Sequence, residues 1–168
     1  MATMPQQGQQ LPDLEFVTEA GERLSAGDLG GEKTILFFYP KDDTSGCTKE
    51  ACAFRDRMGD YEQANIRVYG VSLDSPESHR RFREKYTLNF PLLTDEGGRA
   101  ADALGVLREG GKSANRVTFL LDPSGKIAKV YPEVSPETHA DEILADAASL
   151  EKAAFRGAGE GVSTIPES

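Results

Sequence analysis

The sequence predicts a single α/β domain in which a mixed β-sheet is flanked by helices on both faces. The chain has 168 residues, which is close to the size of one domain. Short apolar segments that suit strands alternate with longer segments that suit helices. The middle of the chain reads strand, helix, strand, helix, which favours parallel strands, whereas the last two strands are separated only by a turn, which favours an antiparallel pair.

Local signals place the elements of the first half of the chain. Ala20-Gly21 separates two short segments and predicts a hairpin. An apolar segment that ends at Pro40 favours a central strand buried on both faces. A polar, turn-like segment then leads into a run of helix formers. The predicted elements are strands at residues 15–17, 22–24 and 33–39, a helix at 47–64 and a strand at 66–73.

The second half has equally clear signals. Asp74-Ser75-Pro76-Glu77 provides an N-cap and an early proline, which predict the start of a helix. Asp122-Pro123-Ser124-Gly125 predicts a turn between two antiparallel strands, and Pro136 begins the last helix. The predicted elements are helices at residues 76–86 and 99–104, a short strand at 90–93, strands at 116–121 and 126–131, and the last helix.

This order of elements fits a thioredoxin-like arrangement, although the pattern alone is also compatible with a flavodoxin-like one. Residues 1–10 are rich in Gln and low in hydrophobicity, which predicts a disordered N-terminal tail. A glycine-rich segment opens a second predicted tail over residues 157–168. The folded unit is then expected to span residues 11–156.

Composition and charge exclude several classes of function. Lys and Arg number 19 and Asp and Glu number 28, so the formal net charge is −9. A negative field repels phosphate backbones, and the chain has no basic patch that would overcome it. The longest apolar runs, residues 35–39 and 117–121, are far too short to cross a bilayer. Residues 1–10 lack the features of a secretory signal. We therefore expect a protein that binds neither nucleic acid nor membrane. Two cysteines without a signal peptide indicate the reducing cytoplasm, and we expect a monomer there.

The cysteines and histidines argue against a metal site. Four residues lie between Cys47 and Cys52. Metal sites instead use Cys-x2-Cys spacing with additional His or Cys ligands. The two histidines, His79 and His139, are distant in sequence and lie in polar segments. We expect both to be exposed residues on helices, and we expect no bound metal.

The predicted position of Cys47 favours a reactive cysteine. It falls within the first turn of the helix that follows a buried strand, where unpaired N–H groups and the helix dipole stabilise a thiolate. Cysteines in such positions can have pKa values of roughly 3.5–7.5, against about 8.5 for a free cysteine. A lone cysteine is often only a small buried hydrophobe. The polar, turn-forming neighbours of Cys47 favour a reactive thiol instead.

The segment Pro40-x3-Thr44-x2-Cys47-x2-Glu50 resembles the active-site signature of the peroxiredoxins. The spacing Cys47-x4-Cys52 is similar to that of the peroxiredoxin Q, or bacterioferritin comigratory protein, branch of that family. The resemblance continues through residues 72–79, 90–95 and 116–122, and so covers nearly the whole predicted folded unit. It implies a thioredoxin-like fold and a thiol-dependent peroxidase that reduces hydrogen peroxide and organic hydroperoxides. One departure is Ser45, where the branch often has Pro, which gives the turn before Cys47 more freedom.

The resemblance also implies roles for individual residues. Cys47 would be the peroxidatic cysteine, whose thiolate attacks one peroxide oxygen and becomes a sulfenic acid. The Thr44 hydroxyl would bond the thiolate and the peroxide. Arg116 would stabilise the thiolate and the charge that develops on the leaving oxygen. Pro40 would shape and shield the pocket, and Glu50 completes the signature. No organic cofactor is implied, because sulfur carries both electrons.

Each of these residues also has a purely structural interpretation. Thr44 suits a helix N-cap, and Glu50 suits a first-turn acid that interacts favourably with the helix dipole. Arg116 suits a surface charge at the end of a strand. Pro40 suits the end of a strand.

Cys52 would be the resolving cysteine in this resemblance, forming a disulfide with Cys47 that a thioredoxin-type protein then reduces. Five residues of ideal α-helix advance ~7.5 Å and rotate the side chains ~140° apart. A disulfide needs Cα atoms within about 7 Å and converging Cβ vectors. The helix would therefore have to unwind locally in each cycle. The alternative is that Cys52 is a packing residue.

Two other functions compete with a peroxidase. A thioredoxin-like thiol–disulfide oxidoreductase normally needs Cys-x2-Cys, which closes a disulfide at the start of a helix without unwinding it. The x4 spacing, together with Thr44 and Arg116, argues against that class. A redox-sensing module on the same fold is the non-enzymatic alternative.

Overall fold

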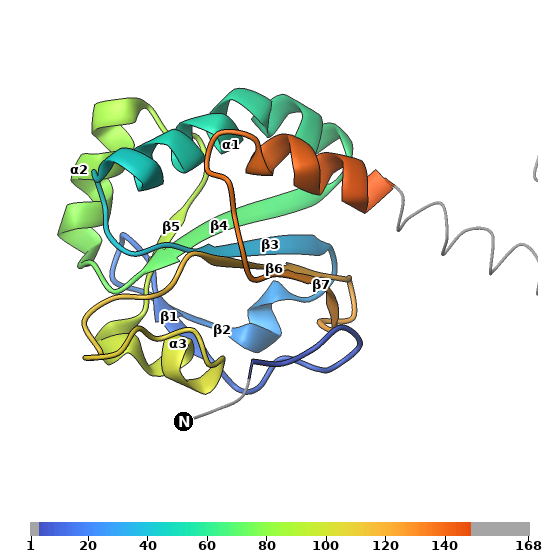
Figure 1. Cartoon of the computed structure of the whole chain (residues 1–168), viewed down its shortest axis with the longest axis horizontal. Coiled ribbons are helices and arrows are strands. Elements are labelled where there is room, and N and C mark those ends of the chain that lie inside the picture. The colour runs from blue at the N-terminus through green and yellow to red at the C-terminus, as the bar shows by residue number, and fades with distance from the viewer. Residues whose placement is uncertain (1–3, 149–168) are drawn as a thin grey trace, which may run out of the picture.

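Seven strands form one mixed sheet in the computed structural model, which describes residues 4–148 (Figure 1). The order across the sheet is β2-β1-β5-β4-β3-β6-β7. β4 pairs in parallel with β3 and β5, whereas β1 with β5, β3 with β6 and β6 with β7 are antiparallel. The strands are β1 (Glu15–Val17), β2 (Arg23–Ser25), β3 (Lys33–Phe38), β4 (Ile66–Ser72), β5 (Leu92–Thr94), β6 (Val117–Leu121) and β7 (Ile127–Tyr131).

Helices cover both faces of this sheet (Figure 1). On one face lie α1 (Ser45–Gln63), α2 (Pro76–Tyr86) and the helix of residues 139–148. On the other face lie the 3₁₀-helix η1 (Ala26–Leu29) and α3 (Arg99–Ala103), which follows the short 3₁₀-helix η2 (Glu96–Gly98). The predicted mixed sheet with helices on both faces is confirmed.

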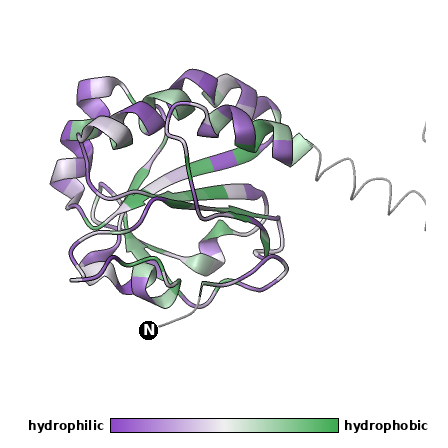
Figure 2. Ribbon diagram, viewed as in Figure 1, coloured by the Kyte–Doolittle hydropathy of each residue, from purple (hydrophilic) through white to green (hydrophobic). Residues whose placement is uncertain are grey.

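The central strand β3 divides the core in two. Phe37 faces the cluster beneath α1 and α2, whereas Leu36 and Phe38 face the cluster beneath α3. All three side chains are fully buried, as expected for a strand in the middle of a sheet covered on both faces. Figure 2 shows the same pattern: the inner strands are largely hydrophobic, and the helices carry hydrophilic residues outward.

The predicted elements agree with the structure to within a few residues at each end. α2 begins at Pro76 and ends at Tyr86, as predicted from the N-cap, and the Ser75 hydroxyl accepts from the N–H of Ser78 at 3.1 Å. The last helix differs slightly, since residues 136–138 form a turn and the helix begins at residue 139. Among residues 4–148, no helix is both long and apolar enough to cross a membrane.

Residues 8–10, which belong to the tail predicted over residues 1–10, are hydrogen-bonded to the chain beside β7. The N–H of Gly8 donates to the Ile127 carbonyl at 2.7 Å, and the N–H of Ile127 donates to the Gln9 carbonyl at 2.9 Å. Gln10 also forms a β-bridge with Lys126. Composition suggested disorder, but the unpaired edge of β7 offers backbone partners to this polar segment. The predicted C-terminal tail, residues 157–168, lies outside the described residues.

Candidate active site

The pairing of β3 with β6 brings two distant segments together. Phe38, the last residue of β3, lies opposite Val117, the first residue of β6. The chain continues from β3 through a loop into α1, while Arg116 immediately precedes β6. The sheet register therefore places Arg116 beside the first turn of α1, although 69 positions separate it from Cys47.

Cys47 lies in that first turn and is only 1% exposed. Its Sγ accepts a hydrogen bond from Arg116 Nη2 at 3.3 Å. A Cβ at Gly46 would lie 2.9 Å from the same Nη2, so a larger residue before Cys47 would displace the guanidinium. Cys47 is thus a buried sulfur in the first turn of a helix, within hydrogen-bond distance of a guanidinium.

Glu50 holds the other side of the guanidinium. It is fully buried, and its Oε1 accepts from Arg116 Nη1 at 2.7 Å. Its Oε2 has no hydrogen-bond partner among residues 4–148. Burial raises the pKa of Glu50 from 4.5 to about 7, although Arg116 acts in the opposite direction. Burial alone would lower the pKa of Arg116, but Glu50 and Cys47 outweigh it and raise that pKa, so Arg116 stays cationic.

These contacts exclude two of the structural interpretations. Arg116 is not a surface charge, since its side chain is 20% exposed and bonds both Cys47 and Glu50. Glu50 is not an exposed first-turn acid, because it lies beyond that turn and is buried against Arg116. Helix periodicity puts Cys47 and Glu50, three residues apart, on one face, and the sheet supplies the arginine.

The buried carboxyl makes stability depend on pH. The folded-state pKa of Glu50, about 7, lies above the ordinary value of 4.5. The contribution of this carboxyl to the free energy of unfolding is therefore fully present below pH 4.5 and is lost as the pH rises through 7. This pKa shift corresponds to a change of about 3 kcal/mol in the free energy of unfolding. We expect Glu50→Gln to gain about that much stability relative to the wild type between pH 4 and pH 8. Urea unfolding of the two reduced proteins across this range measures the difference.

Glu62→Gln is the matched control, because Glu62 lies on the same helix and is exposed. It should follow the wild-type profile at every pH. Parallel profiles for the wild type and Glu50→Gln would show that Glu50 ionises in the folded protein without a desolvation cost.

Thr44 and Pro40 lie on the loop that enters α1. Thr44 is at the N-cap position, with φ −97° and ψ 160°, but its side chain does not cap the helix. Its hydroxyl is exposed and donates to the Lys41 carbonyl at 2.9 Å, so it points at the loop and not at the sulfur. Pro40 is half-buried at the start of the loop. The structure thus brings Arg116 into contact with both Cys47 and Glu50, whereas Thr44 and Pro40 lie on the loop that leads into α1.

Cys52 lies further along the same continuous helix. Both cysteines are free thiols, and Cys52 is partly exposed whereas Cys47 is buried. The N–H of Thr48 donates to the Thr44 carbonyl at 2.8 Å, so helical hydrogen bonding begins before the first cysteine. The intact helix therefore holds the two sulfurs apart, as ideal geometry predicts.

The prediction of exposed histidines is wrong, since both side chains are fully buried. His79 Nδ1 lies 2.8 Å from Asp42 Oδ2, and His139 Nε2 lies 2.8 Å from Thr118 Oγ1. Burial lowers the pKa of His139. Polar neighbours in the sequence suggested exposure, but His79 lies three residues before Phe82 on the inward face of α2. That spacing is the signal that sequence reasoning missed.

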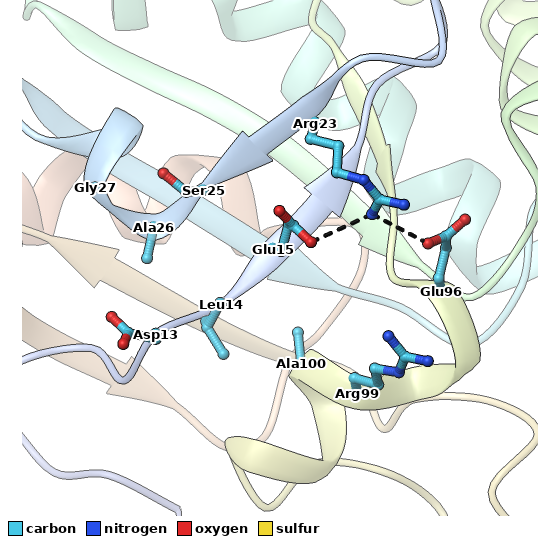
Figure 3. Close-up of a pocket in the computed structure, with 10 residues that line it drawn as sticks. All are labelled: Asp13, Leu14, Glu15, Arg23, Ser25, Ala26, Gly27, Glu96, Arg99 and Ala100. Atoms are coloured by element: carbon cyan, nitrogen blue, oxygen red, sulfur yellow. Dashed lines mark hydrogen bonds and ion pairs between the residues drawn. The ribbon is translucent and has the colours of Figure 1, made fainter.

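A separate cavity of about 520 Å³ opens on the α3 side of the sheet (Figure 3). Arg23 bonds both Glu15 and Glu96 there, each at 3.3 Å, so this cation already pairs with two carboxylates. The cavity contains no residue of the thiol site. Its lining residues are Asp13, Leu14, Glu15, Arg23, Ser25, Ala26, Gly27, Glu96, Arg99 and Ala100. Among residues 4–148, no group of three or more His, Cys, Asp or Glu is arranged to hold a metal.

A buried thiol at the start of a helix, hydrogen-bonded to an arginine beside a mixed sheet, is the arrangement of an enzyme that uses a cysteine as its reactive group. The sequence matches the AhpC/TSA family over residues 7–130, and the chain belongs to that family. A putative peroxiredoxin bcp of Coxiella burnetii is 43% identical over 143 residues, which cover 82% of this chain and 95% of the relative. Peroxiredoxin Bcp of Bacillus subtilis is 40% identical over 143 residues, which cover 82% and 91%.

The solved structures agree. The peroxidoxin BcpB of Mycobacterium tuberculosis matches with a TM-score of 0.78 and 34% identity, over 86% of this chain and 97% of that one. The PrxQ of Xylella fastidiosa matches with a TM-score of 0.79 and 28% identity, over 87% and 96%. The fold is therefore the thioredoxin-like fold of the peroxiredoxins, and the chain is a thiol-dependent peroxidase of the Bcp/PrxQ group.

Proposed function

We propose that Cys47 reduces hydrogen peroxide and organic hydroperoxides by direct attack on oxygen. The thiolate sulfur bonds to one peroxide oxygen as the O–O bond breaks. The sulfur is oxidised to a sulfenic acid, and the second oxygen leaves as water or an alcohol after it takes up a proton. The observation that carries this proposal is the 3.3 Å contact between Cys47 Sγ and the Arg116 guanidinium in a buried site.

Arg116 would stabilise negative charge on the sulfur before the attack and on the leaving oxygen during it. Its guanidinium donates to the sulfur in the resting state, and it is positioned to donate to the leaving oxygen as negative charge develops there. Glu50 would hold the guanidinium in that orientation through its 2.7 Å bond. Thr44 would turn its hydroxyl from the Lys41 carbonyl toward the peroxide, and Pro40 would shield the pocket.

Cys52 would resolve the sulfenic acid. Its thiolate attacks the Cys47 sulfur, a disulfide forms, and the sulfenic oxygen leaves as water. The first turns of α1 must unwind for this, because an intact helix keeps the two cysteines apart. The unwinding also distinguishes this site from a thiol–disulfide oxidoreductase, whose two cysteines meet without it.

A thioredoxin-type protein would then return both cysteines to thiols by thiol–disulfide exchange. The reaction needs no further cofactor, because the two sulfurs carry both electrons of each cycle. We propose that the protein works in the cytoplasm as a monomer, with residues 11–156 as its working domain and residues 8–10 attached beside β7. Its net charge of −9 makes nucleic acid an unsuitable partner.

Cys52→Ser tests the resolving step. The variant should form the sulfenic acid once, at the wild-type rate, and then stop, since no second thiol in the chain can resolve it. It should also be overoxidised more readily to the sulfinic acid. Peroxide consumption with thioredoxin as reductant, followed over many turnovers, measures the loss, and dithiothreitol should restore slow turnover by replacing Cys52.

Amide hydrogen exchange provides the structural half of the same test. Oxidation of the wild type should reduce protection over residues 48–54, while the oxidised Cys52→Ser variant should keep its helix. Sustained turnover of Cys52→Ser with thioredoxin alone, or equal protection of residues 48–54 in both states of the wild type, would show that Cys52 is a packing residue.

A further inference from the structure

A buried polar cluster joins the loop before α1 to two other elements. Asp42 lies on that loop with its side chain 4% exposed, and His79 of α2 is completely buried. His79 Nδ1 lies 2.8 Å from Asp42 Oδ2 and 3.1 Å from Oδ1. The other ring nitrogen, Nε2, lies 3.0 Å from the carbonyl oxygen of Leu93 in β5. One histidine therefore connects the loop with both α2 and β5.

Both nitrogens of His79 have hydrogen-bond partners. The Leu93 carbonyl only accepts, so Nε2 carries a hydrogen. Nδ1 faces the Asp42 side chain, whose oxygens also accept from the Tyr39 hydroxyl at 2.6 Å and the Ser78 hydroxyl at 2.8 Å. Burial and the charge of Asp42 raise the pKa of Tyr39, which keeps its hydroxyl protonated. The result is a buried hydrogen-bonded pair in which both side-chain oxygens of Asp42 have partners.

Asp42 controls how the chain enters α1. Its backbone N–H donates to Asp74 Oδ2 at 2.8 Å, which fixes the loop backbone at this point. Asp43 follows in the left-handed conformation, with φ 59°, and Thr44 then takes the N-cap position. Since only one residue separates Asp42 from the N-cap, the position of Asp42 sets the direction of the first turn. That turn carries Cys47.

We propose that Asp42 and His79 are positioning residues of the peroxidase reaction, whose hydrogen-bonded pair holds the first turn of α1 so that the Cys47 sulfur and the Arg116 guanidinium face one peroxide. This inference rests on the proposed role of Cys47. Reacting groups must be aligned closely, and a misplacement of about 1 Å can cost roughly 100-fold in rate.

The ratio of two reaction rates of Cys47 tests the proposal. Reaction with hydrogen peroxide needs the sulfur and the guanidinium together, whereas alkylation by iodoacetamide needs only an accessible thiolate. We expect Asp42→Asn to lower the peroxide-to-iodoacetamide ratio roughly 100-fold. Alkylation should not slow, because Cys47 is 1% exposed and a loosened turn exposes it. Trypsin cleaves after Lys49, between the two cysteines, so mass spectrometry can follow Cys47 alone.

Asp43→Asn is the matched control. Asp43 is the next residue of the same loop, and its carboxylate pairs with Lys85 at 2.8 Å at an exposed site. Exposed pairs contribute little, and Asn tolerates the left-handed conformation, so its ratio should stay within about twofold of the wild type. Ser78→Ala removes one hydrogen bond from Asp42 at a half-buried position and should lower the ratio a few-fold without threatening the fold.

His79→Gln completes the set. It should lower the ratio about as much as Asp42→Asn does, and the double variant should be no worse than the poorer single one, because both changes break the same pair. An unchanged ratio in folded Asp42→Asn would overturn the proposal, as would a drop of equal size in Asp43→Asn. If Asp42→Asn does not fold, an unchanged ratio in Ser78→Ala overturns it. A wild-type Cys47 that is not oxidised by peroxide would instead overturn the proposed function itself.

Discussion

Replacing Cys47 with Ser should reduce peroxide consumption to the uncatalysed background. The change keeps the size and position of the side chain but replaces a thiol by an alcohol, which supplies no comparable nucleophile near neutral pH. Neither the Arg116 guanidinium nor the helix N-terminus can compensate, because both act by stabilising a thiolate. Steady-state peroxide consumption with thioredoxin and thioredoxin reductase measures the effect.

The control for this variant is Cys52→Ser under single-turnover conditions. It carries the same chemical change five residues further along α1, yet it should still consume one equivalent of peroxide. Turnover of Cys47→Ser at anything near the wild-type rate would mean that another group attacks the peroxide, and the assignment of Cys47 would be wrong.

Replacing Arg116 with Ala should lower the second-order rate of Cys47 with peroxide by roughly 10²–10³. This is the scale of losing one preorganised donor that faces developing charge. The variant also leaves the buried Glu50 carboxyl without its cation, so folding should be checked by circular dichroism before kinetics. Stopped-flow measurement of a single oxidation isolates this step from resolution and reduction.

Two further arginine variants test whether the loss is specific to the Arg116 guanidinium. Arg116→Lys keeps the charge but loses the planar fork that reaches Cys47 and Glu50 together, so an intermediate loss is expected. Arg108→Ala removes an exposed arginine from the segment before β6 and should leave the rate unchanged. A loss below threefold in Arg116→Ala would mean that the guanidinium contributes only structure.

Much of the fold could be predicted because its signals are local. The N-cap and early proline before α2, the turn between β6 and β7, and the apolar run of β3 each depend on neighbouring residues. The position of Cys47 in the first turn of α1 is local in the same way, because a strand, a turn and a run of helix formers follow one another directly.

Other features depend on which distant segments meet. His79 and Glu50 are polar residues, and only the packing of α1 and α2 against the sheet buries them completely. The pairing of Gly8 and Gln9 with Ile127 likewise depends on an edge strand that the chain forms more than a hundred residues later. Burial of a polar group costs free energy unless a partner satisfies it, and those partners are known only when the tertiary contacts are known.

The sequence by itself determined the order of strands and helices, the helix that carries both cysteines, and the residues that resemble a peroxiredoxin site. Only the tertiary structure decided that Arg116 bonds Cys47 and Glu50 together, that Thr44 points at the loop, and that Asp42 pairs with a buried histidine. The physical reason is that propensity, capping and spacing act over a few residues, whereas the desolvation and pairing of charges depend on atoms that sheet register and helix packing bring within about 3 Å.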